Sequence, residues 1–276
     1  MNKHVSDFGQ HLRAWRQRRR LSQLDLACDA GISTRHLSFM ETGRARPSRE
    51  MILRLSDHLE VPLRQRNVML TAGGFAPVYP ERGLDDPSLE PARRAVELVL
   101  EGHHPYPALA VDRHWNLIRA NRMVQVMLQG AAPHLLEPPC NVLRLSLHPE
   151  GLAPAIVNLG QWREHVLHRL RQQVETSADA GLEALHAELA AYPVPDTATD
   201  TAGGFPAAMI DYVVPLQMRT ADGLVLSVFS TTTMFGTPVD VTLSEIAIEA
   251  FLPADDATAE ALRQIAANMT PPEEAG

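Results

Sequence analysis

The chain has 276 residues, 45% of them apolar, and a formal net charge of −8. This length predicts two domains, and the lack of any uncharged apolar stretch of about 18 residues argues against a transmembrane helix. The first residues lack the apolar segment of a signal peptide, and Cys28 and Cys140, the two cysteines, stand too far apart to suggest a disulfide framework or thiolate zinc site. We therefore expect a cytoplasmic protein that does not bind a membrane.

The charge is divided unevenly along the chain. Residues 1–80 carry 13 basic and 7 acidic side chains, a net charge of +6, whereas residues 81–276 carry 12 and 26, a net charge of −14. Twelve of the 13 basic residues in the first part are arginines, which suit contacts with phosphate and guanine better than lysines do. An anionic partner is therefore expected at the N-terminal end only.

The first 75 residues predict five short helices, which we assign to an all-α domain over residues 1–75. The first helix has one apolar face, at spacings of three and four residues, formed by Val5, Phe8, Leu12 and Trp15. Ser22 and Asp25 form a capping-box pattern, which predicts the start of the second helix. A third helix is expected after Ser33, and two more before Gly73.

The second and third helices carry a helix-turn-helix pattern. From Gln23 the sequence runs QLDLACDAGISTRHLSFMETG. Such a motif needs a small residue where the helices cross, which is Ala27, and a glycine in the turn, which is Gly31. Apolar residues must build the shared core, and these are Leu26, Ile32, Leu37 and Met40. All these demands are met in the basic part of the chain.

The segment SQLDLA…GIS…METGRARPS resembles the phage-repressor-like (Xre-type) helix-turn-helix family, over residues 5 to about 72. The resemblance implies that Gln23 binds a phosphate of a double-stranded DNA operator and that the third helix enters the major groove. The corresponding residues are Ser33, Thr34, Arg35, Ser38 and Phe39. Thr34 and Arg35 depart from the glutamines that many members carry at the early reading positions, so the operator sequence is not implied.

The chemistry of these residues agrees with DNA binding. Arg35 can pair with guanine N7 and O6, and Phe39 can contact a thymine methyl group. Three arginines that follow the third helix suit phosphate contacts, namely Arg44, Arg46 and Arg49. Other readings stay open: Phe39 packs in the core, His36 is merely exposed, and the arginines at 16, 18, 19 and 20 form a solvated face. A protein-interaction module is a further alternative, against which the local charge of +6 argues.

The rest of the chain predicts a mixed α+β domain. Four prolines indicate an irregular linker over residues 76–91, followed by a domain over residues 92–268 and a tail over residues 269–276. Strands are expected at Ala108–Val111, Trp115–Arg119, Ile210–Met218, Leu224–Met234 and 241–252, the last of which also fits a helix. Helices are expected at 92–101, Asn121–Leu128, over most of the stretch up to residue 192, and at Thr258–Asn268.

The segment PYPALAVDRHWNLIRANRMVQVML has the element order of the start of a PAS-type sensor. Together with NVLRLSLHPEGLAP and LSVFSTTTMFGTPVDVTL it resembles the MmyB-like ligand-binding domain, which is found fused to this kind of helix-turn-helix. The two resemblances cover residues 5–265. They imply a PAS-like α+β fold with an antiparallel sheet, in which a long-chain fatty acid binds.

A tunnel for such a ligand needs apolar walls and one polar anchor at its mouth. One helical side with several apolar residues is the expected wall, and it includes Leu147, Leu159, Trp162 and Val166. Arg144 and His148 stand four residues apart, so on a helix they share a face and suit a carboxylate. The alternatives are a simple core for the apolar set, a surface or ion-paired Arg144, and a turn-capping His148.

Enzyme signatures are poor, since the sequence has no GxSxG, P-loop, GxGxxG or HExxH pattern, and His165 and His168 are expected to be exposed. The sequence therefore predicts a non-enzymatic, homodimeric, sequence-specific DNA-binding regulator. We expect a repressor controlled by a small apolar ligand such as a fatty acid, with no metal and no other cofactor. Two alternatives stay open: a ligand-independent regulator of phage or antitoxin type, and a haem or flavin sensor of PAS type.

Overall fold

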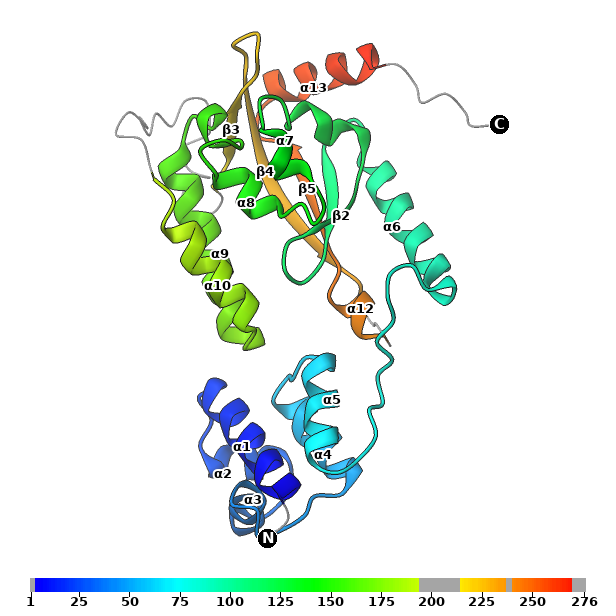
Figure 1. Ribbon diagram of the computed structural model, residues 1–276, viewed down its shortest axis with the longest axis vertical. Coiled ribbons are helices and arrows are strands. Elements are labelled where there is room, and N and C mark those ends of the chain that lie inside the picture. Colours follow the sequence, from blue (N-terminus) through cyan, green and yellow to red (C-terminus); the bar gives the residue numbers. More distant parts are fainter. Residues whose placement is uncertain (1–2, 194–213, 237–239, 270–276) are drawn as a thin grey trace. The chain divides into compact units, whose positions relative to one another are not determined.

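The computed structural model describes residues 3–193, 214–236 and 240–269 (Figure 1). Its internal contacts form two compact units, of which the first holds the residues up to 83 together with Glu175–Ser177 and 240–244. Each unit has its own cluster of buried apolar side chains. The described helices include none with the length and apolar character needed to cross a bilayer.

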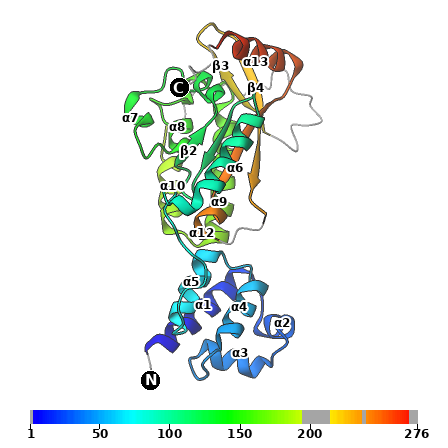
Figure 2. The ribbon, with the colours of Figure 1, turned by 90° about the vertical axis from the view of Figure 1, so that its right-hand side faces the viewer.

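Residues 3–72 form helices at the expected places. They are α1 (Lys3–Arg18), α2 (Gln23–Asp29), α3 (Thr34–Glu41), α4 (Arg49–His58) and α5 (Leu63–Ala72) (Figure 2). The predicted capping box is present, because the Ser22 hydroxyl accepts from the Asp25 amide and the Asp25 carboxylate accepts from the Ser22 amide. Gly31 has a φ of +59°, as the turn of the motif requires.

Close packing of α1 on α3 sets the geometry of this unit. Leu26, Leu37 and Met40 are fully buried and join three apolar residues of α1 in one cluster, namely Phe8, Leu12 and Trp15. Gly9 lies where the two helices meet, and a Cβ atom there would be 2.5 Å from the carbonyl oxygen of Glu41. Only glycine therefore allows this approach.

A buried ion pair links the same helices. Arg16 Nε donates to Glu41 Oε1 at 2.6 Å, and Gln23 Nε2 donates to Glu41 Oε2 at 2.7 Å, so one carboxylate joins α1, α2 and α3. Arg19 donates to the carbonyls of Leu59 and Glu60, which end α4. A solvated face is therefore the wrong interpretation for Arg16 and Arg19, because both side chains hold neighbouring helices.

The second unit is built on an antiparallel five-stranded sheet, which confirms the expected α+β class. The strands are β1 (Ala108–Val111), β2 (Leu117–Ala120), β3 (Leu216–Arg219), β4 (Val225–Met234) and β5 (Ala247–Pro253), in the order β2-β1-β5-β4-β3. Both predicted hairpins form. Residues 210–213 of one predicted strand lie outside the described residues.

Three predicted elements differ from the structure. Residues 241–252 are not one strand: α12 (Val241–Ser244) precedes β5, because the Asp240 carboxylate caps the amides of Thr242 and Leu243. The expected helix at 121–128 is the 3₁₀ helix η2 (Arg122–Val126). The expected linker contains η1 (Pro87–Leu89) and the first turn of α6 (Glu90–Gly102), where a proline is well tolerated.

Helices cover both faces of the sheet. Further elements are α7 (Pro133–Leu136), α8 (Val142–Leu147), η3 (Ala153–Ala155), α9 (Leu159–Ser177), α10 (Ala180–Ala190) and α13 (Asp256–Asn268). α6 packs against β1 and β5, and α13 against β4 and β5. α8 and α9 cover the face that carries Leu109, Glu249 and Phe251 (Figure 1).

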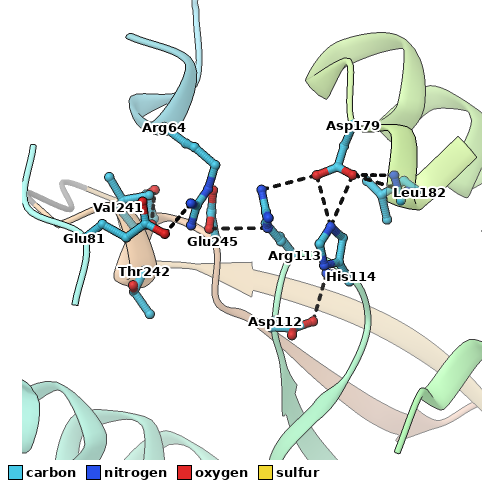
Figure 3. Close-up of polar contacts among 12 residues, drawn as sticks. Arg64, Glu81, Asp112, Arg113, His114, Asp179, Leu182, Val241, Thr242 and Glu245 are labelled. Carbon is cyan, nitrogen blue, oxygen red and sulfur yellow. Dashed lines mark hydrogen bonds and ion pairs between the residues drawn. The ribbon is translucent and has the colours of Figure 1, made fainter. Parts of the chain in front are cut away.

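The β1–β2 hairpin loop holds the start of α10. Asp179 caps this helix by accepting from the amides of Gly181 and Leu182, and its carboxylate also lies 3.0 Å from His114 Nε2. Arg113 Nη1 lies 3.3 Å from the same carboxylate, and Figure 3 shows both loop side chains directed at it. Burial by itself raises the pKa of Asp179, but the hydrogen bonds from the Gly181 amide and from His114, together with the charge of Arg113, outweigh it and lower the pKa below its ordinary value.

We predict that Glu41→Ala lowers the free energy of unfolding by about 3 kcal/mol, because it leaves Arg16 buried without its anion. Urea denaturation of the full chain measures this. The matched control is Asp29→Ala, an exposed acid at the end of α2, for which we expect a change within about 0.5 kcal/mol. Equal stability of the two variants would contradict the importance of the pair.

Candidate functional site

The outer face of α3 carries the predicted base-reading residues. Arg35 is exposed, and its guanidinium lies 5.2 Å from the centroid of the half-buried Phe39 ring. Phe39 lies outside the buried cluster of the unit, so its alternative role in the core is not what the structure shows. Thr34 and Ser38 are half-buried on the same helix. These four residues form a short polar and aromatic surface.

Two predicted DNA contacts also have roles inside the protein. Ser33 is the N-cap of α3, where its hydroxyl accepts from the His36 amide. The amide of Gln23 donates to Glu41, so this side chain is oriented by the buried pair. Both residues lie at the starts of their helices, where free backbone amides and the helix dipole favour an anion.

The arginines expected to contact phosphate are exposed. Arg44 and Arg46 lie in the loop after α3, and Arg49 is the first residue of α4. With Arg35, they place four exposed guanidinium groups on consecutive elements of the helix-turn-helix. This distribution suits a polyanion, because each arginine can pair with one phosphate.

The second unit encloses a cavity of about 200 Å³ between the sheet and helices α8 and α9. Most of the side chains that line it are apolar, and they include Leu109, Trp115, Leu143, Leu145, Trp162, Val166, Leu216 and Phe251. The polar lining residues are Ser146, His165, Arg169, Ser230 and Glu249. An apolar cavity with a few convergent polar groups is the usual form of a small-molecule site.

One face of α9 supplies the polar wall, through Trp162, His165 and Arg169 at helical spacing. Arg169 donates through both terminal nitrogens to Glu249 of β5, which is 3% exposed, and its guanidinium lies 4.7 Å from the ring centroid of Trp115. Thr232 also donates to Glu249, at 2.8 Å. The charge of Glu249 is thus compensated within the protein.

His165 lies against this pair. Its ring stacks on Trp162 with centroids 5.4 Å apart. Burial, and then the charge of Arg169, lower the pKa of His165 below its ordinary value, which favours the neutral ring. The sequence placed both His165 and His168 at exposed positions, and this is correct only for His168.

The predicted carboxylate anchor lies elsewhere. α8 ends at Leu147, and His148 has an extended backbone because it precedes Pro149, so it does not share a helix face with Arg144. Arg144 makes two hydrogen bonds to the Glu188 carboxylate, which also accepts from Tyr192. The Arg144 guanidinium is the main cause that lowers the pKa of Glu188 to about 2, whereas burial and Glu188 raise the pKa of Tyr192 to about 12.

The structure therefore brings together only part of the predicted ligand site. Trp162 and Val166 line the cavity. Leu147 and Leu159 are buried in the core of the unit but do not line the cavity, and Arg144 and His148 do not reach it. The ion pair at the cavity is formed by Arg169 and Glu249, which stand 80 positions apart in sequence. The spacing of Trp162, His165 and Arg169 on one helix could have suggested Arg169, whereas no local pattern points to Glu249.

Comparisons with known proteins match a different family model to each of the two units of the chain. Residues 92–265 match the family model of the MmyB-like transcription regulator ligand binding domain, and residues 7–69 match that of a helix-turn-helix domain. No curated protein matches the sequence. Both matched families are regulatory, and they bind ligands and DNA respectively.

Two solved structures that match the chain differ in how much of it they cover. One is the clp gene regulator ClgR from Corynebacterium glutamicum, with 24% identity, a TM-score of 0.23, and coverage of 37% of this chain and 95% of ClgR. The other is an RNA-binding light-oxygen-voltage receptor, with 13% identity, a TM-score of 0.24, and coverage of 96% of this chain and 64% of the receptor.

The Arg144–Glu188 pair predicts a specific acid sensitivity. Because the pKa of Glu188 is lowered in the folded state, its contribution to stability is fully present above pH 4.5 and is lost as the pH falls toward about 2. The stability difference between the wild type and Glu188→Gln should therefore shrink over this interval, in denaturation measured at several pH values. Glu183→Gln, an exposed change on the same helix, is the matched control and should show no such trend. A pH-independent difference for Glu188→Gln would show that the pair does not form in solution.

Proposed function

Because this chain belongs to the MmyB-like transcription regulator family, we propose that it is a sequence-specific homodimeric repressor of Xre type, controlled by a small apolar ligand of the fatty-acid class. That it is a DNA-binding transcription regulator with a ligand-binding domain follows from the two family matches. The sign of regulation, the ligand class and the homodimer are our proposals.

The cavity under α9 is the observation that carries the ligand proposal. Its wall is apolar apart from one group of polar side chains, so a ligand with an apolar body and one polar end suits it. Its volume of about 200 Å³ lies below the range of about 300–1,000 Å³ that is typical of ligand pockets. A long ligand therefore needs side chains to move or a second cavity to open.

Control of DNA binding requires that the ligand favours one of two states of the protein. Two helix-turn-helix units on one face of DNA require half-sites about 34 Å apart, or a multiple of that distance. In one state of the dimer, the distance between the two helix-turn-helix units does not match the half-sites. A ligand that binds this state more tightly would cause the dimer to dissociate from the operator. The difference between its affinities for the two states limits the size of this switch.

We predict that Arg35→Ala lowers the preference for the operator over random DNA by about 1–3 kcal/mol, or about 5- to 150-fold, because it removes a bidentate contact to a base. The operator is first selected from random double-stranded DNA with the wild type, and affinities are then measured over a range of salt concentrations. An unchanged preference in Arg35→Ala would mean that another residue reads the base.

The matched control is Arg44→Ala, which removes an exposed arginine assigned to phosphate. It should weaken binding to both DNAs alike and reduce the slope of log affinity against log salt by about 1. If Arg44→Ala lowers the preference as much as Arg35→Ala does, the division between base and phosphate contacts is wrong.

Ligand binding can be read from tryptophan fluorescence, because Trp115 and Trp162 line the cavity and the chain has only three tryptophans. We predict that brominated hexadecanoate quenches most of the fluorescence of delipidated protein. Val166→Phe, which fills part of the cavity, should weaken this binding about tenfold. Leu167→Phe changes the next residue of α9, which does not line the cavity, and should leave the affinity unchanged.

Other results obtained with the same purified protein would support one of the two alternative functions. Lack of quenching, together with lack of any apolar acid in solvent extracts of the purified protein, would indicate a ligand-independent regulator. A visible absorption band of the purified protein above the aromatic region would indicate the haem or flavin sensor.

A further inference from the structure

A second cavity lies in the same unit as the first. Its volume is about 250 Å³, and its apolar lining includes Val126, Met218, Leu226, Val228 and Leu262. Met127 lines both cavities. The two spaces are therefore neighbours that share one flexible side chain.

The register of the sheet places the two cavities in line. On β4, Leu226 and Val228 line the second cavity and Ser230 lines the first, and alternate residues of a strand point to the same face. On the paired strand β3, Met218 lines the second cavity and Leu216 the first. Both cavities thus lie over one face of the sheet, one after the other along β4.

Both ends of this line carry polar side chains, which differ in their burial. At one end, Thr232 of β4 meets Glu249 and Arg169 beside the first cavity. At the other end, the second cavity is lined by apolar residues such as Leu226 and Leu262 and also by the polar residues Gln129, Arg219 and Thr220. Positions 226 and 232 are six residues apart, which is about 20 Å in a strand. Gln129 and Arg219 are exposed to solvent, whereas Glu249 is buried and ion-paired with Arg169 under α9. A long molecule that fills both cavities would therefore meet the buried polar group at the first one.

We propose that the two cavities are one binding site for a straight-chain amphiphile, with its polar head near Arg169 and its tail past Met127 in the second cavity. This inference rests on the proposed function and adds a tail site to it. Met127 is the divider, and it is half-buried, unbranched and flexible, so it can move aside at low cost. The second cavity then sets the longest chain that binds.

The test is a chain-length series. Isothermal titration calorimetry of delipidated full-length protein uses straight-chain acids from octanoate to octadecanoate and, in parallel, the corresponding alcohols, so that the head and tail contributions are separated. In the wild type, each methylene buried should raise the affinity about fourfold until the second cavity is full. In Met127→Trp, the rise should stop at a shorter chain, and the longest compounds should lose the most affinity, at least about tenfold, because the larger side chain closes the way into the second cavity.

Two further variants make the result specific. Ala155→Phe narrows the second cavity from its other wall and should shorten the preferred chain in the same way. Gln125→Trp places the same large side chain at an exposed position two residues from Met127, away from both cavities, and should behave as the wild type does. Circular dichroism checks that each variant is folded.

The outcomes separate this inference from the proposed function. If the acids or alcohols bind but Met127→Trp and Ala155→Phe keep the wild-type dependence on chain length, the tail does not enter the second cavity and the inference fails. If no compound of either series binds to the wild type, the proposed ligand class fails, and the tail site with it.

Discussion

The second unit depends on one buried carboxylate. Glu249 points from the middle strand of the sheet toward the face under α9, where an uncompensated charge would be very costly. Arg169 compensates it, and so α9 must run where its guanidinium can reach β5. The same face of α9 then presents Trp162 and His165 to the space between helix and sheet. The requirement to neutralise Glu249 therefore also gives an otherwise apolar cavity its polar wall.

The helix-turn-helix unit uses the same principle at a different place. Glu41, at the end of α3, is held by Arg16 from α1 and by Gln23 from α2. An exposed recognition surface needs rigid support, because a base contact tolerates little error in position. Here the support comes from a buried ion pair beneath the surface, whereas Arg35 remains free to turn toward a partner. Gln23, for which the sequence predicts a phosphate contact, is part of this support, because its hydrogen bond to Glu41 fixes its orientation.

Local patterns were sufficient for much of this structure. The capping box at Ser22, the glycine turn at Gly31 and both hairpins follow from interactions between residues near in sequence, and all were predictable. The polar wall of the cavity was not, because Arg169 and Glu249 meet only when helix and sheet have packed. The predicted anchor failed for a local reason that the sequence did contain: a residue before proline leaves the helix, so His148 could not share a face with Arg144.

The contact at Gly9 has a genetic consequence. No other side chain fits between α1 and the carbonyl oxygen of Glu41, so any substitution there must push the recognition helix from its place. A screen for loss of regulation should therefore recover substitutions of Gly9, although this residue is neither a predicted DNA contact nor a lining residue of the ligand cavity. Such alleles would resemble defects in operator recognition. Second-site suppressors of such alleles would be expected among the residues of α3 that face α1, and not among the exposed residues of α3 that are predicted to contact DNA.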